Sequence, residues 1–269
     1  MYPLGSSPAE FERLRRQHET WRGPTEALWR RAGFGPGQSI VDLGCGPGLT
    51  TIDLARLVDQ RGERGCVLGI DASATAATAA RDAVARQGVS NVRIVTAAAG
   101  DADFSAEQPD GIFARWLFCY LSDPAAVLRR AARDLRSGGV VAVMDYWHYL
   151  AIRTEPQSPL FDTVFRAVYQ SFGDAGGSLD VAGALPRHCE AAGLSVRHVE
   201  PVSAIGRPGS PVWAWIGDFQ ALYLLTLVER GYLTPDASAD YLAWWNGLDG
   251  STTAFVFAPP MLSVVAVKR

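Results

Sequence analysis

The chain has 269 residues, of which 20% are charged and 48% hydrophobic, and its net charge is −3 at pH 7. These values are typical of a folded globular protein and exclude a disordered chain. No basic run supplies the phosphate-neutralising stripe of a nucleic-acid binder, so we expect no nucleic-acid partner. The length suits one large α/β domain with insertions, or two small domains.

The sequence also argues against secretion and membrane insertion. The segment Met1-Tyr2-Pro3-Leu4 lacks the charged and apolar regions of a signal peptide, and Asp145 and His148 interrupt the apolar stretch 140–152. The four cysteines contain no C-x-x-C pair and the four histidines no H-x-x-x-H pair. We therefore expect a reducing, cytoplasmic location, no membrane partner and no metal.

Two helices are predicted at the N-terminus. Ser7-Pro8-Ala9-Glu10 has the capping serine, first-turn proline and glutamate of a helix start. Gly23-Pro24 is expected to end this helix, and a second one is predicted over residues 25–32. The pair either covers the sheet or lies over a ligand cleft as a lid, and the sequence favours neither.

The most informative stretch is Ile40-Val41-Asp42-Leu43-Gly44-Cys45-Gly46-Pro47-Gly48. An apolar strand over 39–43 leads into three alternating glycines, and a helix is predicted from Leu49. Glycine lets a backbone turn tightly and approach a ligand. The third glycine comes one residue earlier than in the dinucleotide pattern G-x-G-x-x-G, and Pro47 lacks an N–H, so a dinucleotide fits poorly.

This stretch resembles motif I of the class I S-adenosylmethionine (SAM)-dependent methyltransferases, an acidic residue followed by G-x-G-x-G. The resemblance is close over residues 38–147 and implies SAM as cofactor, with S-adenosylhomocysteine (SAH) as product. It assigns cofactor-binding roles to Asp42, Gly44, Cys45, Gly46 and Gly48.

A second cofactor contact is expected at the end of the next strand, residues 66–71. Asp71 lies 23 positions after Gly48, near the spacing of about 20 for a ribose-binding carboxylate. In the resembled family the matching acid binds both ribose hydroxyls, and Ala72 beside it is included in the predicted site. Asp71 is also compatible with a role as a cap for the helix that follows.

The third strand, 92–96, is followed by Ala97-Ala98-Ala99-Gly100-Asp101-Ala102. The resemblance places an acid facing the adenine amino group here. We assign this contact to Asp101 with Ala102. By strand length Ala98 is the alternative, in which case backbone groups would hold the adenine.

Strands over 110–116 and 140–146 complete an alternation of strands and helices, which is typical of a doubly wound sheet. Ligands bind at the carboxyl ends of such strands, so Arg115 and Trp116 are added to the predicted cofactor site. We predict an α/β fold: a Rossmann-like, doubly wound, seven-stranded sheet, mostly parallel with the last strand antiparallel, carrying helical lid insertions.

The remaining chain adds helices after Ser158, Ser210 and Thr234, and strands over 195–205 and 262–267. We divide the chain into an N-terminal helical lid (1–37), a SAM-binding core (38–150) and the rest of the sheet with substrate-cap helices (151–269), all within one compact domain. Six of the eight tryptophans lie in the N-terminal helices or in the 206–250 insertion. The other two, Trp116 and Trp147, lie at strand ends and are expected to face the cleft. Together they favour an aromatic pocket for a flat or apolar acceptor.

His148 is the candidate general base, because an imidazole titrates near pH ~6.5 and follows the fifth strand. Tyr120, Tyr146 and Tyr149, together with Arg115, are candidates for orienting the acceptor. His148 as a packed surface side chain is the alternative, and His18 is a second candidate base if the N-terminal helix is a lid.

The resemblance predicts methyl transfer to a small molecule, through an oxygen or nitrogen nucleophile, such as a secondary metabolite. The fourth strand ends in Ala114-Arg115-Trp116-Leu117, without the N-P-P-Y/F or P-C signatures of nucleic-acid-methylating relatives. A SAM-fold protein with another reaction or a binding role, and an NAD-dependent oxidoreductase, remain alternatives. The sequence leaves the oligomeric state open, with a homodimer as one candidate.

Overall fold

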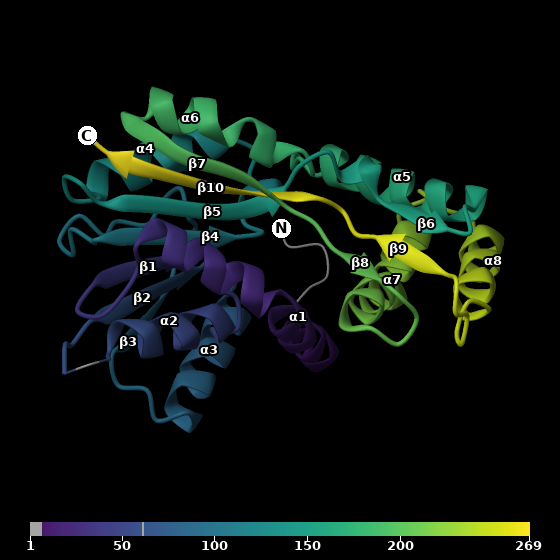
Figure 1. Cartoon of the computed structure of the whole chain (residues 1–269), viewed down its shortest axis with the longest axis horizontal. Helices are drawn as coiled ribbons and strands as arrows, with labels where there is room; N and C mark the ends of the chain where they lie inside the picture. The colour runs from purple at the N-terminus through teal and green to yellow at the C-terminus, as the bar shows by residue number, and fades with distance from the viewer. Residues whose placement is uncertain (1–6, 61) are drawn as a thin grey trace.

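The computed structural model describes residues 7–60 and 62–269. The segment Met1–Leu4, on which the expectation about secretion rests, lies outside these residues, as does the start of the proposed lid. Figure 1 shows one large twisted sheet with helices on both faces, and a helical extension at the carboxyl ends of its parallel strands.

The large sheet has seven strands in the order β3-β2-β1-β4-β5-β10-β7. The strands from β1 to β5 pair in parallel, whereas β10 is antiparallel to both neighbours. The order reverses at β1 and β4, which confirms the predicted doubly wound sheet. The strands are β1 (Ser39–Leu43), β2 (Cys66–Asp71), β3 (Val92–Thr96), β4 (Gly111–Arg115), β5 (Val140–Tyr146), β7 (Leu194–Val202) and β10 (Met261–Lys268).

Helices cover the two faces of this sheet (Figure 1). On one face lie α1 (Pro8–Ala32), α2 (Leu49–Val58) and α3 (Ala74–Arg86), and on the other α4 (Pro124–Asp134) and α6 (Leu185–Ala191). The central strands read as near-continuous apolar runs because both faces are buried. Ile40, Phe113 and Ala142 are accordingly inaccessible to solvent.

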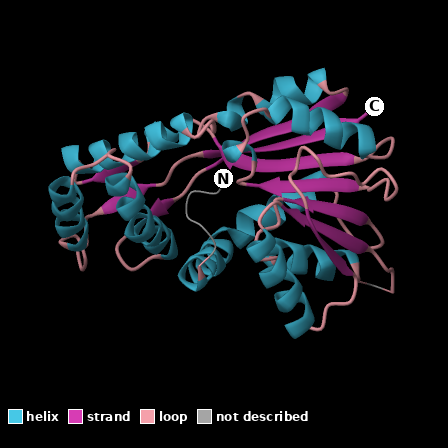
Figure 2. Ribbon diagram, turned by 180° about the vertical axis from the view of Figure 1, so that it is seen from behind, coloured by secondary structure: helices cyan, strands magenta, loops and turns pink. Residues whose placement is uncertain are grey.

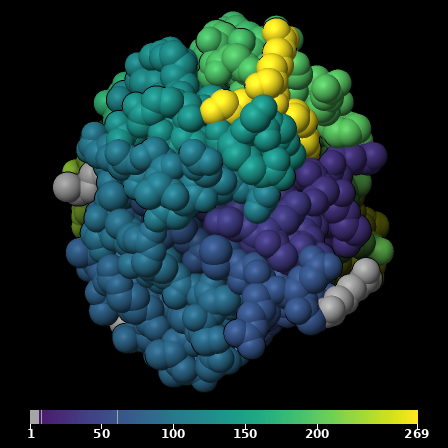
Figure 3. All heavy atoms as spheres, turned by 90° about the vertical axis from the view of Figure 1, so that its left-hand side faces the viewer, coloured from purple at the N-terminus to yellow at the C-terminus, as the bar shows by residue number. Residues whose placement is uncertain are grey.

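The N-terminal segment is one helix of 25 residues, so the predicted break at Gly23-Pro24 is wrong. Ser7 does cap it, since its Oγ accepts a hydrogen bond from the Glu10 N–H at 3.1 Å. Helix α1 continues through Pro24 because side chains on both sides of that residue are buried, including Trp21 and Leu28. In the space-filling view of Figure 3, α1 (purple) fills the space between the blue α2–α3 half and the yellow C-terminal strand.

The C-terminal extension consists of α5 (Pro159–Asp174), α7 (Pro211–Glu229) and α8 (Pro235–Asn246). Ser158, Ser210 and Thr234 cap them as the sequence suggests, each followed by proline at the first turn. A small antiparallel sheet, not expected from the sequence, joins this region: β6 (Arg153–Glu155), β9 (Phe255–Phe257) and β8 (Ile205–Gly206). Figure 2 shows it in magenta among the helices of the extension. The predicted strand over 195–205 is therefore divided between β7 and β8.

Helix α7 is the one helix in residues 7–60 and 62–269 that is long and apolar enough, by length and composition, to cross a membrane. It packs against α1, α5 and α8, and Trp213, Tyr223 and Leu227 on it are buried. These contacts account for its apolar composition, which is therefore weak support for a membrane span.

The interior position of Pro24 leads to a prediction about stability. Alanine at this position restores an N–H for the Thr20 carbonyl and removes the clash of the proline ring. Pro24→Ala should therefore raise the free energy of unfolding by about 1 to 2 kcal/mol, measured by urea denaturation. Pro211→Ala, at the first turn of α7 where no N–H is needed, should give no gain. A Pro24→Ala protein less stable than the parent would contradict this account of α1.

Candidate functional site

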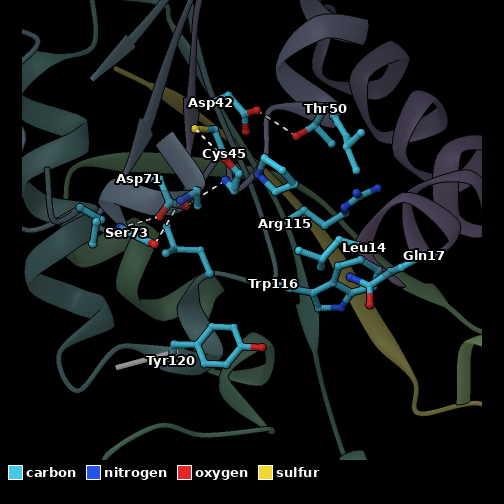
Figure 4. Close-up of a pocket in the computed structure, with 18 of the residues that line it drawn as sticks. Leu14, Gln17, Asp42, Cys45, Thr50, Asp71, Ser73, Arg115, Trp116 and Tyr120 are labelled. Atoms are coloured by element: carbon cyan, nitrogen blue, oxygen red, sulfur yellow. Dashed lines mark hydrogen bonds between the residues drawn. The ribbon is translucent and has the colours of Figure 1, made fainter. Parts of the chain in front are cut away.

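A cavity of about 610 Å³ opens at the carboxyl ends of the parallel strands (Figure 4). Its floor is formed where β1, β2, β4 and β5 end, and α1 and α7 form its walls. We call the part around Gly46 and Asp71 the glycine-turn end. The part lined by Trp116, Tyr146 and Trp215 is the aromatic end.

The three glycines of the turn all have positive φ, but they serve different purposes. A Cβ on Gly44 would lie 3.0 Å from Leu117, and one on Gly48 would lie 3.0 Å from Ala80, so these two allow close packing. A Cβ on Gly46 would meet no protein atom within 4 Å, and its φ is 52°. Gly46 thus leaves open a place at the cavity wall where a ligand can approach the backbone.

Asp71 links this turn to the end of β2. One carboxylate oxygen accepts the Gly46 N–H at 2.8 Å, and the other accepts the Ser73 N–H at 2.8 Å. Each oxygen of a carboxylate has a further lone pair, so both can still accept a hydroxyl. The cap of α3 is Ser73, whose Oγ accepts the Ala76 N–H. Asp71 is therefore not needed as that cap, and it lines the cavity together with Ala72.

Asp42 is fully buried beneath the turn and lines the same end of the cavity. Burial raises the pKa of this carboxyl, although hydrogen bonds from the Thr51 and Thr50 hydroxyls, at 2.6 and 2.9 Å, favour its charged form. Cys45 lies beside it, and burial raises the pKa of its thiol, which stays protonated.

Arg115 lies between the two ends of the cavity and also holds α1. Its guanidinium donates to the Thr25 hydroxyl at 2.7 Å and to His18 Nδ1 at 3.2 Å, and it lies 4.8 Å from the ring centroid of Trp116. Because Nδ1 accepts, His18 carries its proton on Nε2, which lies 3.0 Å from a carboxylate oxygen of Asp53 on α2. Burial lowers the pKa of Arg115 to about 10, so it remains charged at neutral pH.

Aromatic side chains form the other end of the cavity. Trp116 stacks on Trp215 with ring centroids 6.0 Å apart, and Tyr146 meets Tyr149 edge-on at 5.1 Å. Burial raises the pKa of both tyrosines well above its usual range, so their hydroxyls stay protonated and can donate hydrogen bonds. The side chains at this end are Phe11, Leu14, Trp116, Tyr120, Leu121, Tyr146, Tyr149, Phe172, Leu179, Trp215, Ile216, Phe219 and Pro259.

Comparison with known proteins identifies the family. Residues 40–139 match the model of a methyltransferase domain. Methyltransferase GfsG of Streptomyces halstedii is 30% identical over 210 residues, which cover 77% of this chain and 69% of that protein. The chain belongs to the SAM-dependent methyltransferase family. SAM is therefore the cofactor, and the glycine turn and Asp71, which match the family's motif, are the candidate site for it.

Two further similarities concern a second relative and the fold. The ubiquinone/menaquinone biosynthesis C-methyltransferase of Vibrio cholerae is 33% identical over 147 residues, which cover 52% of this chain. The match spans 54% of that relative, about half of its length. The crystal structure of the [4+2]-cyclase SpnF superimposes with a TM-score of 0.58 at 18% identity, covering 91% of this chain and 80% of that one, and shows the shared fold.

The structure does not bring His148, the expected base of this methyltransferase, to the cavity. His148 is exposed and has a left-handed backbone conformation with φ 54°. This residue turns the chain after β5 so that Tyr146 and Tyr149 face the cavity while Trp147 and His148 face away. Trp147 is 43% exposed, so the expectation that it faces the cleft is wrong. The second candidate, His18, lies buried among polar partners and does not line the cavity.

The turn after β3 also differs from expectation. Ala97, Ala98 and Ala99 line the cavity, whereas Asp101 is exposed and neither it nor Ala102 lines the cavity. The chain leaves the cavity wall at a tight turn, in which the Asp101 N–H donates to the Ala98 carbonyl at 2.9 Å. The structure therefore favours the alternative, Ala98, as the residue beside the adenine.

Helix α1 forms a wall of the cavity, as in the second of the two alternatives for the N-terminal segment, but two of its polar residues were not predicted as site residues. Arg13 and Gln17 line the cavity there, next to Phe11 and Leu14. Apolar residues at helical spacing, such as Phe11 and Leu14, indicate a buried face of a helix, but they do not show which polar neighbours border that face. Within residues 7–60 and 62–269, no three His, Cys, Asp or Glu side chains are grouped as a metal site.

The open wall at Gly46 predicts how an added methyl group acts. Gly46→Ala should weaken SAH binding at least about tenfold, because the new Cβ occupies the approach to the backbone. Titration calorimetry and thermal unfolding would be measured together. Gly250→Ala is the matched control, since Gly250 also has positive φ (79°) and a Cβ there would meet no atom within 4 Å, but it does not line the cavity. Equal SAH affinity in the Gly46→Ala protein and the parent would argue against this role.

Asp145, at the end of β5 behind the aromatic end, predicts a pH dependence of stability. Burial raises its pKa to about 6, although the N–H groups of Tyr146 and Cys119 donate to it. The unfolded pKa is about 3.9, so the native state binds more protons between these values and stability falls as pH rises through them. The loss attributable to Asp145 is about 3 kcal/mol. This loss of stability should be absent from Asp145→Asn, measured by urea denaturation over the same pH range. If the free energy of unfolding of the two proteins changed with pH in the same way, the assignment to Asp145 would be wrong.

Proposed function

We propose that this methyltransferase moves the methyl group of SAM to a small-molecule acceptor bound at the aromatic end of the cavity. An oxygen or nitrogen nucleophile is expected, and a secondary metabolite would suit the bulky walls. The observation that carries the proposal is that one continuous cavity has the glycine turn and Asp71 at one end and apolar, aromatic side chains at the other.

The residues at the glycine-turn end fit the cofactor. Gly46 leaves space at the backbone, and the Asp71 carboxylate keeps lone pairs for two ribose hydroxyls. Ala98 and its neighbours would face the adenine, while Asp42 and Arg115 would attract the charged groups of the methionine part. Bound SAM supplies an electrophilic methyl group, whose bond to sulfur breaks with its electron pair as the acceptor's lone pair forms the new bond, leaving SAH.

The chain's own contribution is positioning and exclusion of water. The aromatic walls and α1 enclose the acceptor, and holding it near the methyl group makes the reaction effectively unimolecular. The carboxylates that line the cavity within residues 7–60 and 62–269 are Asp42 and Asp71, both at the glycine-turn end, and no histidine lines it. We infer that an acceptor loses its proton to solvent rather than to a general base of the cavity.

The name of one relative supports a small-molecule acceptor, although that relative is named for transfer to carbon rather than to oxygen or nitrogen. The Vibrio cholerae protein is named as a C-methyltransferase of quinone biosynthesis, and GfsG as a methyltransferase. By analogy, nucleic acid and membranes are not expected as partners of this chain. A cytoplasmic location and a homodimer remain predictions.

A second function stays open because SpnF, whose fold is similar, is a [4+2]-cyclase. A protein of this fold can therefore serve a reaction other than methyl transfer. An NAD-dependent oxidoreductase is disfavoured, because Pro47 offers no N–H to a pyrophosphate in the glycine turn.

Titration calorimetry with SAM, SAH and NADH in parallel tests the cofactor. We expect binding of SAM and SAH with dissociation constants near ~1–100 μM and none of NADH. Incubation with methyl-deuterated SAM and a panel of phenols, enols and amines should then give products heavier by one labelled methyl group in mass spectrometry. Binding of SAM without any labelled product across the panel would favour a cyclase-like or binding role. Binding of NADH alone would refute the proposal.

A further inference from the structure

The side-chain amide of Gln17 on α1 is fixed in one orientation at the cavity wall. Its Oε1 accepts hydrogen bonds from Arg13 Nη1 at 2.7 Å and from Trp215 Nε1 at 2.8 Å. Guanidinium and indole N–H groups only donate, so the atom that they share must be the amide oxygen. The positions of Oε1 and Nε2 in the amide are therefore known, and the two N–H groups of Nε2 are not used by Arg13 or Trp215.

The clamp that fixes this amide is rigid. Arg13 is buried and held by both oxygens of Glu10, at 2.7 and 2.8 Å. Trp215 is buried on α7 and stacked on Trp116. Gln17 is therefore held from its own helix and from the helix opposite, and little conformational freedom remains to be lost when a ligand binds.

The Nε2 group faces a ligand site without a protein acceptor. Gln17 lines the cavity beside Leu14 and Trp116 (Figure 4), and Nε2 donates to no residue in 7–60 or 62–269. The nearby hydroxyls of Tyr146 and Tyr149 stay protonated because burial raises their pKa. The aromatic end of the cavity thus presents hydrogen-bond donors, while the carboxylates that line the cavity lie at the glycine-turn end.

We propose that Gln17 is the specificity-determining residue for the acceptor and donates to an acceptor oxygen, so that the methyl acceptor is an ionised enol or phenol rather than an amine. This inference rests on the proposed methyl transfer. An oxygen nucleophile can accept a hydrogen bond with one lone pair and attack with another. A neutral amine has a single lone pair, which a donor at this position would block.

The step then balances without a general base. The acidic enol or phenol gives its proton to solvent before binding, and its oxygen arrives as an anion. A lone pair of that oxygen forms the bond to the methyl carbon, and the pair of the breaking carbon–sulfur bond stays on sulfur. The products are a neutral ether and SAH, and Gln17 keeps its protons throughout.

A pair of probes with one skeleton tests the inference: 4-hydroxycoumarin, an acidic enol, and 4-aminocoumarin, its amine counterpart. Each is titrated by calorimetry into protein saturated with SAH at pH 7.5. We expect the enol to bind at least about tenfold more tightly than the amine, equivalent to one charge-assisted hydrogen bond. In Gln17→Glu the carboxylate can still accept from Arg13 and Trp215, but it offers no donor, so this preference should disappear.

Two controls separate recognition from folding. Gln170→Glu makes the same change at an exposed position of α5 and should keep the parent's preference. The affinity of Gln17→Glu for SAH alone should equal that of the parent, which verifies its fold. Gln17→Met, of similar length, should lose the preference as well.

The outcomes are distinct. The inference would be overturned if the parent bound the two probes equally, if it bound neither, or if the preference survived in Gln17→Glu. In each of these cases, binding of SAH would leave the proposed function intact. Failure of SAH to bind the parent would instead overturn the proposed function itself.

Discussion

The hydrogen bond between the Gly46 N–H and the Asp71 carboxylate is the contact on which the site depends. It joins the turn after β1 to the end of β2, at 2.8 Å, and sets the distance between the two elements that would hold a nucleoside. The neighbouring strands are fixed by the sheet, so the cavity floor is rigid. The other oxygen of the Asp71 carboxylate accepts the Ser73 N–H, so the carboxylate is oriented before any ligand binds.

A second constraint places α1 over this floor. Arg115, at the end of β4, bonds Thr25 and His18 of α1, and His18 in turn reaches Asp53 of α2. The partly buried Arg115 therefore lines the cavity and holds α1 in place. Through His18 it also links α1 to α2, the helix that follows the glycine turn. The proposed acceptor wall and the proposed cofactor site are therefore parts of one connected structure, which suits a reaction that depends on placing two molecules in line.

The sheet, the glycine turn and the position of Asp71 could be predicted because each has a local signal in the sequence: apolar runs for the strands, three alternating glycines for the turn, and an acidic residue at the end of the second strand. The positions where the structure differs from the predictions depend on contacts between distant residues or on a single backbone angle. Pro24 stays inside a helix because of tertiary packing, and the positive φ of His148 turns it away from the cavity. Asp101 follows a motif by sequence, but a tight turn at Ala98 carries it to the surface. The amide of Gln17 gave no signal, because its orientation is set by Trp215, which is far away along the chain.

In the proposed complex one cavity holds both molecules, with the nucleoside on Asp71 and the sulfur toward the aromatic end. The most direct measurement is a crystal structure of the SAH complex. We expect both ribose hydroxyl oxygens within hydrogen-bonding distance of the Asp71 carboxylate, the adenine beside Ala98, and the sulfur on the Trp116 side of Gly46. A nucleoside bound elsewhere, or a sulfur atom turned away from Trp116 and Tyr146, would contradict it.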